Sequence, residues 1–95
     1  MMKNYENLLI LDPGLGEEEV NKEIAGIAET VSKYKGKVET TNIWGKRVFA
    51  YPIKEKNEGF YVLLGMKLLP ESIGKIKKEL DLKSKILRYS ILNKD

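Results

Sequence analysis

The fold is decided by a stretch that reads Trp44-Gly45-Lys46-Arg47-Val48-Phe49-Ala50-Tyr51-Pro52-Ile53. Polar and apolar residues alternate along it, and the same alternation, rich in Val, Thr and Ile, reaches back to Lys37. Alternation of this kind predicts a half-buried β-strand over 37–53. The polar cluster 54–59 predicts a turn, and the apolar run 60–69 predicts a second strand. We therefore expect an antiparallel β-hairpin.

Two helices and two further strands are expected around this hairpin. Residues 3–11 end in a short apolar run that Asp12-Pro13-Gly14 stops, which predicts a strand. From Glu17 onward, apolar residues fall every three or four positions, which predicts a helix that ends at Gly36. Pro70 suits the first turn of a second helix, and 86–92 closes the chain as a strand. The apolar stripes of the two helices are Val20, Ile24, Ile27 and Val31, and Ile73, Ile76 and Leu80.

The order strand, helix, strand, strand, helix, strand predicts an α+β fold, a ferredoxin-like split β-α-β sandwich. Its sheet has four antiparallel strands, with both helices on one face. Right-handed crossovers put the first and third strands in the centre and the second and fourth at the edges. We expect a single domain over 1–95 whose second sheet face has no helix to cover it.

Charge and composition bound the function. The chain has 95 residues, of which 42% are hydrophobic and 33% charged, with no Cys and no His. Disulfides, thiolate chemistry and histidine acid–base catalysis are therefore absent. The net charge is −5 over 1–32, +5 over 33–56 and +3 over 57–95. That positive stretch suits a polyanion, and an ordinary solvated lysine-rich surface fits it equally well. No signal peptide or membrane span is recognised, so we expect a cytoplasmic protein.

Catalytic motifs are weak. Gly14-Leu15-Gly16 follows a strand and precedes a helix, but it lacks a third Gly and a Lys, and three Glu residues follow it. Glu17, Glu18, Glu19 and Glu23 are expected to form a solvated first turn rather than a metal site. The turn after the first strand has no Arg for an acyl-phosphate hydrolase. The aromatic pattern of an RNA-recognition domain is also incomplete around Phe60 and Tyr61. We predict no enzyme, no metal and no cofactor.

The hairpin places cations beside aromatic residues. Simple alternation puts one set of side chains on one face and the intervening set on the other, unless a bulge at Gly45 shifts the register. The first set is Trp44, Lys46, Val48 and Ala50, and the second is Gly45, Arg47, Phe49 and Tyr51. Cations and aromatics together are typical of phosphate and sugar contacts. They also protect an edge strand against aggregation, and the residues alone leave both interpretations open.

Residues 44–54 resemble the signature of the bacterial small-subunit ribosomal protein S6 family, in which Gly, a basic pair and Ala-Tyr-Pro-Ile recur. Further stretches fall in the family's order, so the resemblance covers essentially the whole chain. They are Tyr5-Glu6, Leu11-Asp12-Pro13, Gly59-Phe60-Tyr61-Val62-Leu63, and Leu80 leading to Ile86-Leu87-Arg88.

The resemblance implies a structural protein that binds the central domain of 16S ribosomal RNA together with ribosomal protein S18, with no small-molecule substrate and no membrane. The residues that it assigns to RNA are Lys3, Lys46, Arg47, Lys54 and Arg88. The exposed residues expected to contact the partner are Trp44, Val48, Tyr51 and Leu92. Two departures from the family pattern are Val48, where a polar residue is usual, and Phe49, where Leu is usual.

One alternative of a different class remains. A small regulatory domain with this fold would form a homodimer through its open sheet face and hold a metabolite between subunits. Only the turn Asp12–Gly16 hints at such a pocket.

Overall fold

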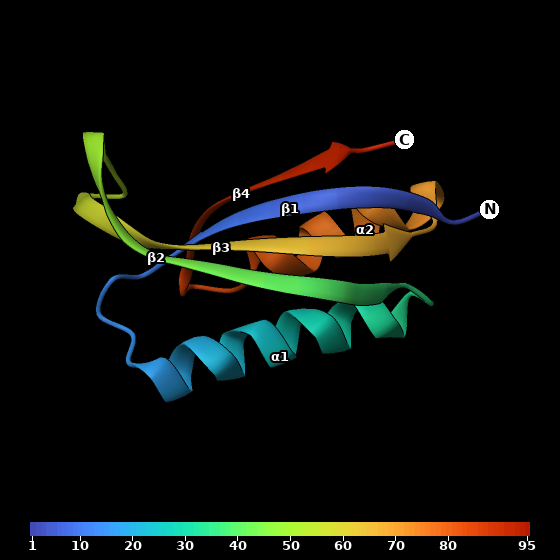
Figure 1. Cartoon of the computed structure of the whole chain (residues 1–95), viewed down its shortest axis with the longest axis horizontal. Helices are drawn as coiled ribbons and strands as arrows, with labels where there is room; N and C mark the ends of the chain where they lie inside the picture. The colour runs from blue at the N-terminus through green and yellow to red at the C-terminus, as the bar shows by residue number, and fades with distance from the viewer.

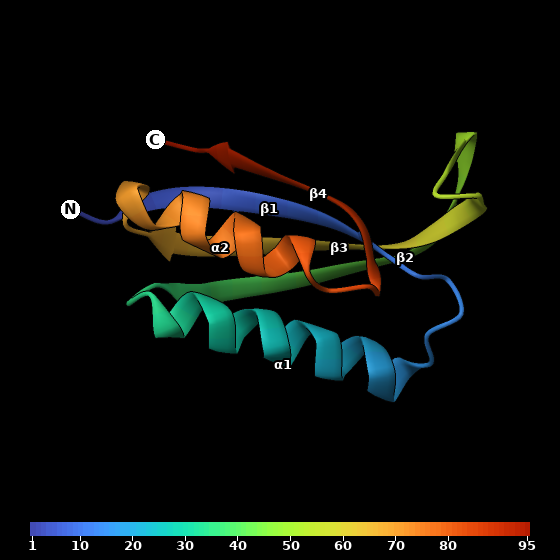
Figure 2. The ribbon, with the colours of Figure 1, turned by 180° about the vertical axis from the view of Figure 1, so that it is seen from behind.

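The computed structural model describes all 95 residues. Four strands form one antiparallel sheet in the order β2-β3-β1-β4, so β1 and β3 are central and β2 and β4 are edges, as predicted. Both helices lie on the same face (Figures 1 and 2). The elements are β1 (Lys3–Leu11), α1 (Glu17–Lys33), β2 (Lys37–Ile53), β3 (Lys56–Leu68), the 3-10 turn Pro70–Ser72, α2 (Ile73–Asp81) and β4 (Ile86–Asn93).

The turn between β2 and β3 is shorter than the sequence predicts. Lys54 and Glu55 both have left-handed backbone angles, with φ of 48° and 65°, and Ile53 pairs directly with Lys56. Two consecutive left-handed residues form the kind of tight turn that matches the twist of a hairpin. The expected loop 54–59 is therefore wrong, because 56–59 are already strand. Asn-Gly is the usual signal for such a turn, and Lys-Glu gives none.

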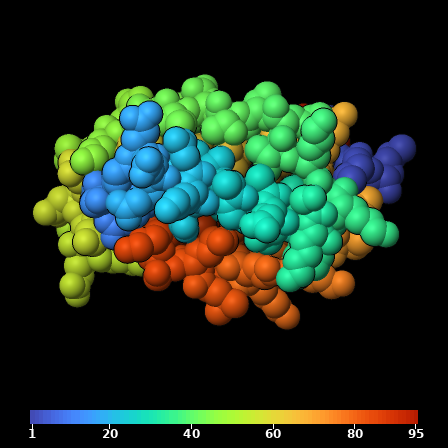
Figure 3. Space-filling model, turned by 90° about the horizontal axis from the view of Figure 1, so that it is seen from below, coloured from blue at the N-terminus to red at the C-terminus, as the bar shows by residue number.

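The core lies between the sheet and the two helices. Alternate residues of the central strands point into it, among them Leu9 and Leu64, both fully buried. The predicted stripes of α1 and α2 face the same layer, although Ile24 and Ile73 are only half-buried. Figure 3 shows α1 lying between the atoms of β2 and those of α2. The residues of this cluster are Tyr5, Leu9, Leu11, Leu15, Val20, Ile27, Val31, Val62, Leu64, Met66, Leu68, Ile76, Leu80 and Ile86.

The other sheet face has no helix over it, as expected. Of its central-strand side chains, Leu8, Tyr61 and Leu63 are half-buried by their neighbours in the sheet rather than by a second layer, and Ile10 is buried. We call this the open face. At one end of it the β2–β3 hairpin extends beyond the sheet and bends toward β4 (Figure 1).

Candidate nucleic-acid interface

A bulge at Gly45 decides which hairpin side chains lie together. The pairing of β2 with β3 shifts between Ile43, opposite Val62, and Gly45, opposite Tyr61. Gly45 has φ +89°, a conformation that glycine adopts without a steric penalty. Trp44 consequently joins Arg47 on the open face. Simple alternation, which groups Trp44 with Lys46, is wrong here, and the bulge that the sequence left as an alternative is confirmed.

Aromatic side chains gather around Tyr61 on the open face. The Trp44 and Tyr61 rings are nearly parallel, at 7°, with their centroids 6.3 Å apart. Phe49 approaches Tyr61 from the tip side at 6.2 Å and 54°. Phe49 can do so because Gly59 has no side chain, since a Cβ there would lie 2.6 Å from Phe49 Cζ and 2.4 Å from Ile10 Cγ2. The bulge and one glycine thus create an aromatic cluster on an exposed surface.

Two guanidinium groups flank this cluster. Arg47 Cζ lies 5.9 Å from the centroid of Trp44, which is cation–π distance. Arg88 lies on the far side, since Tyr61 pairs with Ile10 and Ile10 with Arg88. Two strand spacings separate Tyr61 from Arg88, about 10 Å. Neither guanidinium forms an ion pair with a carboxylate. The open face therefore offers two unneutralised cations beside stacked rings.

Lys54 joins these cations through the bend of the hairpin. Its Nζ donates a hydrogen bond to the Ile86 carbonyl at 3.5 Å, which brings the tip of the hairpin to the start of β4. Lys54 and Arg88 line the same hollow of about 200 Å³. Lys54 and Arg88 are 34 positions apart in the chain, and they lie at the same end of the sheet because the hairpin bends.

The other two predicted RNA residues lie elsewhere. Lys46 pairs with Phe60 and projects toward the side of the sheet that carries the helices. Lys3 pairs with Leu68, eight residues along β3 from Phe60, about 26 Å away. The structure brings together Arg47, Lys54 and Arg88 at the hairpin end and leaves Lys3 at the opposite end.

All four predicted partner residues are exposed. The exposed fractions are 80% for Val48, 82% for Tyr51, 61% for Leu92 and 42% for Trp44. Val48 and Tyr51 lie at the hairpin tip, where a hollow of about 440 Å³ is lined by residues 48–53 together with Tyr61 and Arg88. Leu92 lies four residues along β4 from Arg88 and on the same face, about 13 Å away.

Sequence reasoning missed the role of Tyr61 and the exposure of Leu82 and Ile43. Tyr61 organises the open face, because Trp44 and Phe49 both pack against its ring. Leu82 is 84% exposed just after α2, and Ile43 is 48% exposed on the edge strand. The alternation along β3 places Tyr61 on the open face, so its face was predictable from the sequence. Its contact with Trp44 was not predictable, because that contact depends on the bulge at Gly45.

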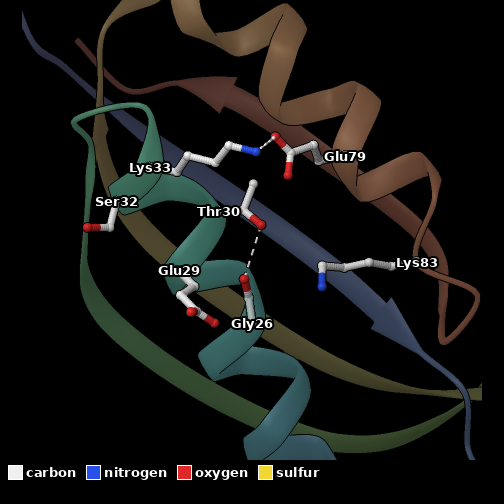
Figure 4. Close-up of a pocket in the computed structure, with 7 residues that line it drawn as sticks. All are labelled: Gly26, Glu29, Thr30, Ser32, Lys33, Glu79 and Lys83. Carbon is white, nitrogen blue, oxygen red and sulfur yellow. Dashed lines mark hydrogen bonds and ion pairs between the residues drawn. The ribbon is translucent and has the colours of Figure 1, made fainter.

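A third hollow lies between α1 and α2 (Figure 4). Its lining is polar and consists of Gly26, Glu29, Thr30, Ser32, Lys33, Glu79 and Lys83. Glu79 accepts hydrogen bonds from the Tyr34 hydroxyl and from Lys33 Nζ, the latter at 3.0 Å. The pKa of Glu79 is lowered most by the hydrogen bond from Tyr34 and next by that from Lys33. The same hydrogen bonds to Glu79 raise the pKa of Tyr34 and the pKa of Lys33. These contacts tie the two helices together.

Asp81 at the end of α2 is engaged in a similar way. Its Oδ1 accepts a hydrogen bond of 2.7 Å from the Tyr89 hydroxyl of β4. Burial, together with this bond, raises the pKa of Tyr89 to about 12. The two acidic side chains of α2 thus serve contacts within the domain.

No group of three or more acidic side chains is placed to hold a metal ion. Neither helix has the length and apolar character needed to cross a membrane.

Comparisons with known proteins agree with this architecture. The crystal structure of 30S ribosomal protein S6 from Thermotoga maritima superposes with a TM-score of 0.90 at 24% identity, over 99% of this chain and 89% of that one, which shows the fold. The P2 domain of the Thermotoga maritima chemotaxis kinase CheA, in complex with the response regulator CheY, shares the fold more distantly, with a TM-score of 0.63 at 19% identity over 98% of this chain and 99% of that one.

Sequence relatives narrow the family. Small ribosomal subunit protein bS6 of Corynebacterium jeikeium is 38% identical over 94 residues, and that of Corynebacterium aurimucosum 37%. The alignments cover 99% of this chain and 99% and 98% of the relatives. The family model for ribosomal protein S6 matches residues 4–93. These full-length matches confirm the resemblance seen in residues 44–54 and favour it over the regulatory-domain alternative. The chain belongs to the ribosomal protein S6 family of the small ribosomal subunit.

Proposed function

We propose that this protein is a non-catalytic assembly component that binds the central domain of 16S ribosomal RNA together with ribosomal protein S18. The observation that carries the proposal is the open face, where unneutralised guanidinium groups and exposed apolar side chains occupy one end of a sheet without a second layer.

The RNA part of the proposal rests on Arg47, Lys54 and Arg88. Guanidinium groups without carboxylate partners are available to phosphate oxygens, which they contact through two parallel hydrogen bonds. Phosphate contacts of this kind position a protein without reading sequence. Lys46, which projects toward the helix side, and Lys3, at the opposite end of the sheet, lie apart from this cluster and would contact RNA separately from it.

The protein part of the proposal rests on Val48, Tyr51 and Leu92, with Trp44 at the border between them and the cations. Large apolar side chains with exposed fractions of 61–82% are typical of a surface that a partner covers, and here they lie at the hairpin tip and on β4. A partner seated here would lie next to Arg88, so the two proteins would present one joint footprint to the RNA.

Salt dependence tests the RNA contacts. We expect the double variant Arg47→Ala and Arg88→Ala to bind the RNA more weakly, in the presence of S18, with a plot of log Kd against log salt that is shallower by about 1.5 to 2 units, because two phosphate contacts are lost. Lys75→Ala with Lys78→Ala is the matched control, since both lysines are exposed on α2, away from the open face. An unchanged slope in the arginine variant would place the RNA site elsewhere.

Partner binding is tested separately. We expect Val48→Ser, Tyr51→Ser and Leu92→Ser combined to weaken binding of S18 in calorimetry without lowering stability, because all three side chains are exposed in the free protein. RNA affinity that is the same with and without S18 would contradict the joint footprint.

A further inference from the structure

Trp44, Arg47 and Tyr61 form a small hollow of their own on the open face. Its volume is about 210 Å³, and these three side chains are its only lining. Drug-sized ligands occupy pockets of roughly 300–1,000 Å³, so this space suits one small ring system. Trp44 remains 42% exposed, so the hollow is reached directly from solvent.

The ring geometry selects a flat occupant. Because the Trp44 and Tyr61 planes differ by only 7°, a planar group that lies parallel to one ring is parallel to the other as well. Aromatic groups prefer such parallel contact with their neighbours. Each lining side chain carries one hydrogen-bonding group, the Arg47 guanidinium, the Tyr61 hydroxyl or the Trp44 indole N–H, whereas stacking on the rings itself accepts any flat ring.

The surrounding charge selects against a cationic side chain. Arg47 already lies over the Trp44 ring, and Arg88 stands about 10 Å across the sheet from Tyr61 on the same face. A lysine or arginine from a partner would enter between two unneutralised positive groups, whereas a nucleotide would bring its own phosphates to them. The charge therefore favours a nucleobase over a basic side chain.

We propose that Trp44 and Tyr61 stack one unpaired RNA base, with Arg47 and Arg88 facing the phosphates on either side of it. This inference rests on the proposed RNA binding and refines it, since it moves Trp44 from the border of the partner surface to the RNA. Stacking on an aromatic ring is tolerant of base identity, because every base has a π face. The contact adds affinity without reading a sequence.

A pair of variants at Tyr61 tests the stacking. In the complex with S18 and the central-domain RNA, we expect Tyr61→Leu to raise the Kd for RNA by about 5- to 150-fold, which corresponds to the loss of one stacked base. Tyr61→Phe keeps the ring and should leave the Kd unchanged. Equal affinity for the two variants overturns the proposal. Circular dichroism of both confirms that each is folded.

Trp44 also supplies a direct probe, since it is the only tryptophan in the chain. With 5-fluorotryptophan in this chain alone, the ¹⁹F resonance should shift when RNA is added to the complex with S18. A shift that S18 causes by itself, with none on adding RNA, means that a partner side chain fills the hollow and overturns the stacking. A complex that assembles with no shift overturns it as well, and leaves the RNA-binding function standing. Failure of the RNA to bind at all removes both proposals.

Discussion

The two faces of the sheet use neighbouring residues in opposite ways. On β3, Leu64 points toward the helices and is fully buried, whereas Leu63 points to the open face and is only half-buried. On the helix side, Glu79 of α2 accepts hydrogen bonds from Tyr34 and Lys33 at the end of α1. The open face instead leaves Arg47 and Arg88 without acidic partners. The side chains that stabilise the fold are concentrated on the face toward the helices, and the side chains that are free to bind lie on the open face.

Neighbouring residues of a strand point to opposite faces of the sheet, so single substitutions at adjacent positions can test this division. A change on the covered face should act on the free energy of unfolding, and a change on the open face should act on binding. Gly59 is an open-face position at which both effects are expected, because its missing side chain lets Phe49 pack against Tyr61.

The largest expected effect separates Leu64 from Leu63. We expect Leu64→Ala to lower the free energy of unfolding by about 2–5 kcal/mol, because it removes buried methyl groups and leaves a cavity. Leu63→Ala should cost clearly less, since its neighbours cover it only in part. Urea denaturation of both variants measures the difference. Equal losses would contradict the assignment of Leu63 to a face without a second layer.

Gly59 lies on the open face at a position where stability and binding are both affected, and Gly74 is its matched control. A Cβ at Gly59 would press on Ile10 and Phe49, so we expect Gly59→Ala to cost about 1–3 kcal/mol and to displace Phe49 from Tyr61. At Gly74 in α2 a Cβ meets nothing within 4 Å, and Gly74→Ala should gain about 0.5–1 kcal/mol through helix propensity. Thermal unfolding measures both. A stabilised Gly59→Ala would mean that Phe49 does not pack across this glycine.

Asn7 is the exception on the covered face. It is fully buried in β1 between Leu64 and Ile91 on the neighbouring strands, and neither its side-chain oxygen nor its nitrogen has a hydrogen-bond partner in the protein. An unsatisfied buried amide is costly, so we expect Asn7→Leu, of similar shape, to gain about 1–2 kcal/mol. Denaturant titration of the variant and the parent measures the difference. A lower free energy of unfolding for Asn7→Leu would show that the amide stabilises the fold.

The arrangement of strands and helices was predictable because each element has its own periodic signal. The stripe Val20, Ile27 and Val31 has the helical period, and the apolar run 8–11 is too short for a helix, so the order of elements leaves few topologies. The turn at Lys54-Glu55 was missed because it uses left-handed residues other than glycine or asparagine. Alternation places Asn7 on the inward face with Leu9 and Leu11, but its burial was missed because an amide is expected to avoid a core position without a hydrogen-bond partner.

The candidate site was predictable residue by residue but not as an assembly. The cations and apolar side chains were identified from residue type and family resemblance, whereas their grouping depends on the Gly45 bulge and the bend of the hairpin. Both are backbone features that shift side chains from one face to the other. Lys3 shows the limit, since resemblance groups it with the hairpin cations and the register places it at the opposite end of the sheet.

The smallest expected effect concerns Glu79 and pH. Its pKa is lowered in the folded protein, first by the hydrogen bond from Tyr34 and then by that from Lys33. A carboxylate with a depressed pKa stabilises the fold above its unfolded value, near 4.5, and this contribution is lost as pH falls through the folded pKa. The Glu79→Gln variant should therefore lose less stability than the parent between pH 5 and pH 3. Because Glu79 is partly exposed, solvent screening keeps the difference small. Parallel curves of unfolding free energy against pH would show that the charge of Glu79 does not stabilise the folded protein.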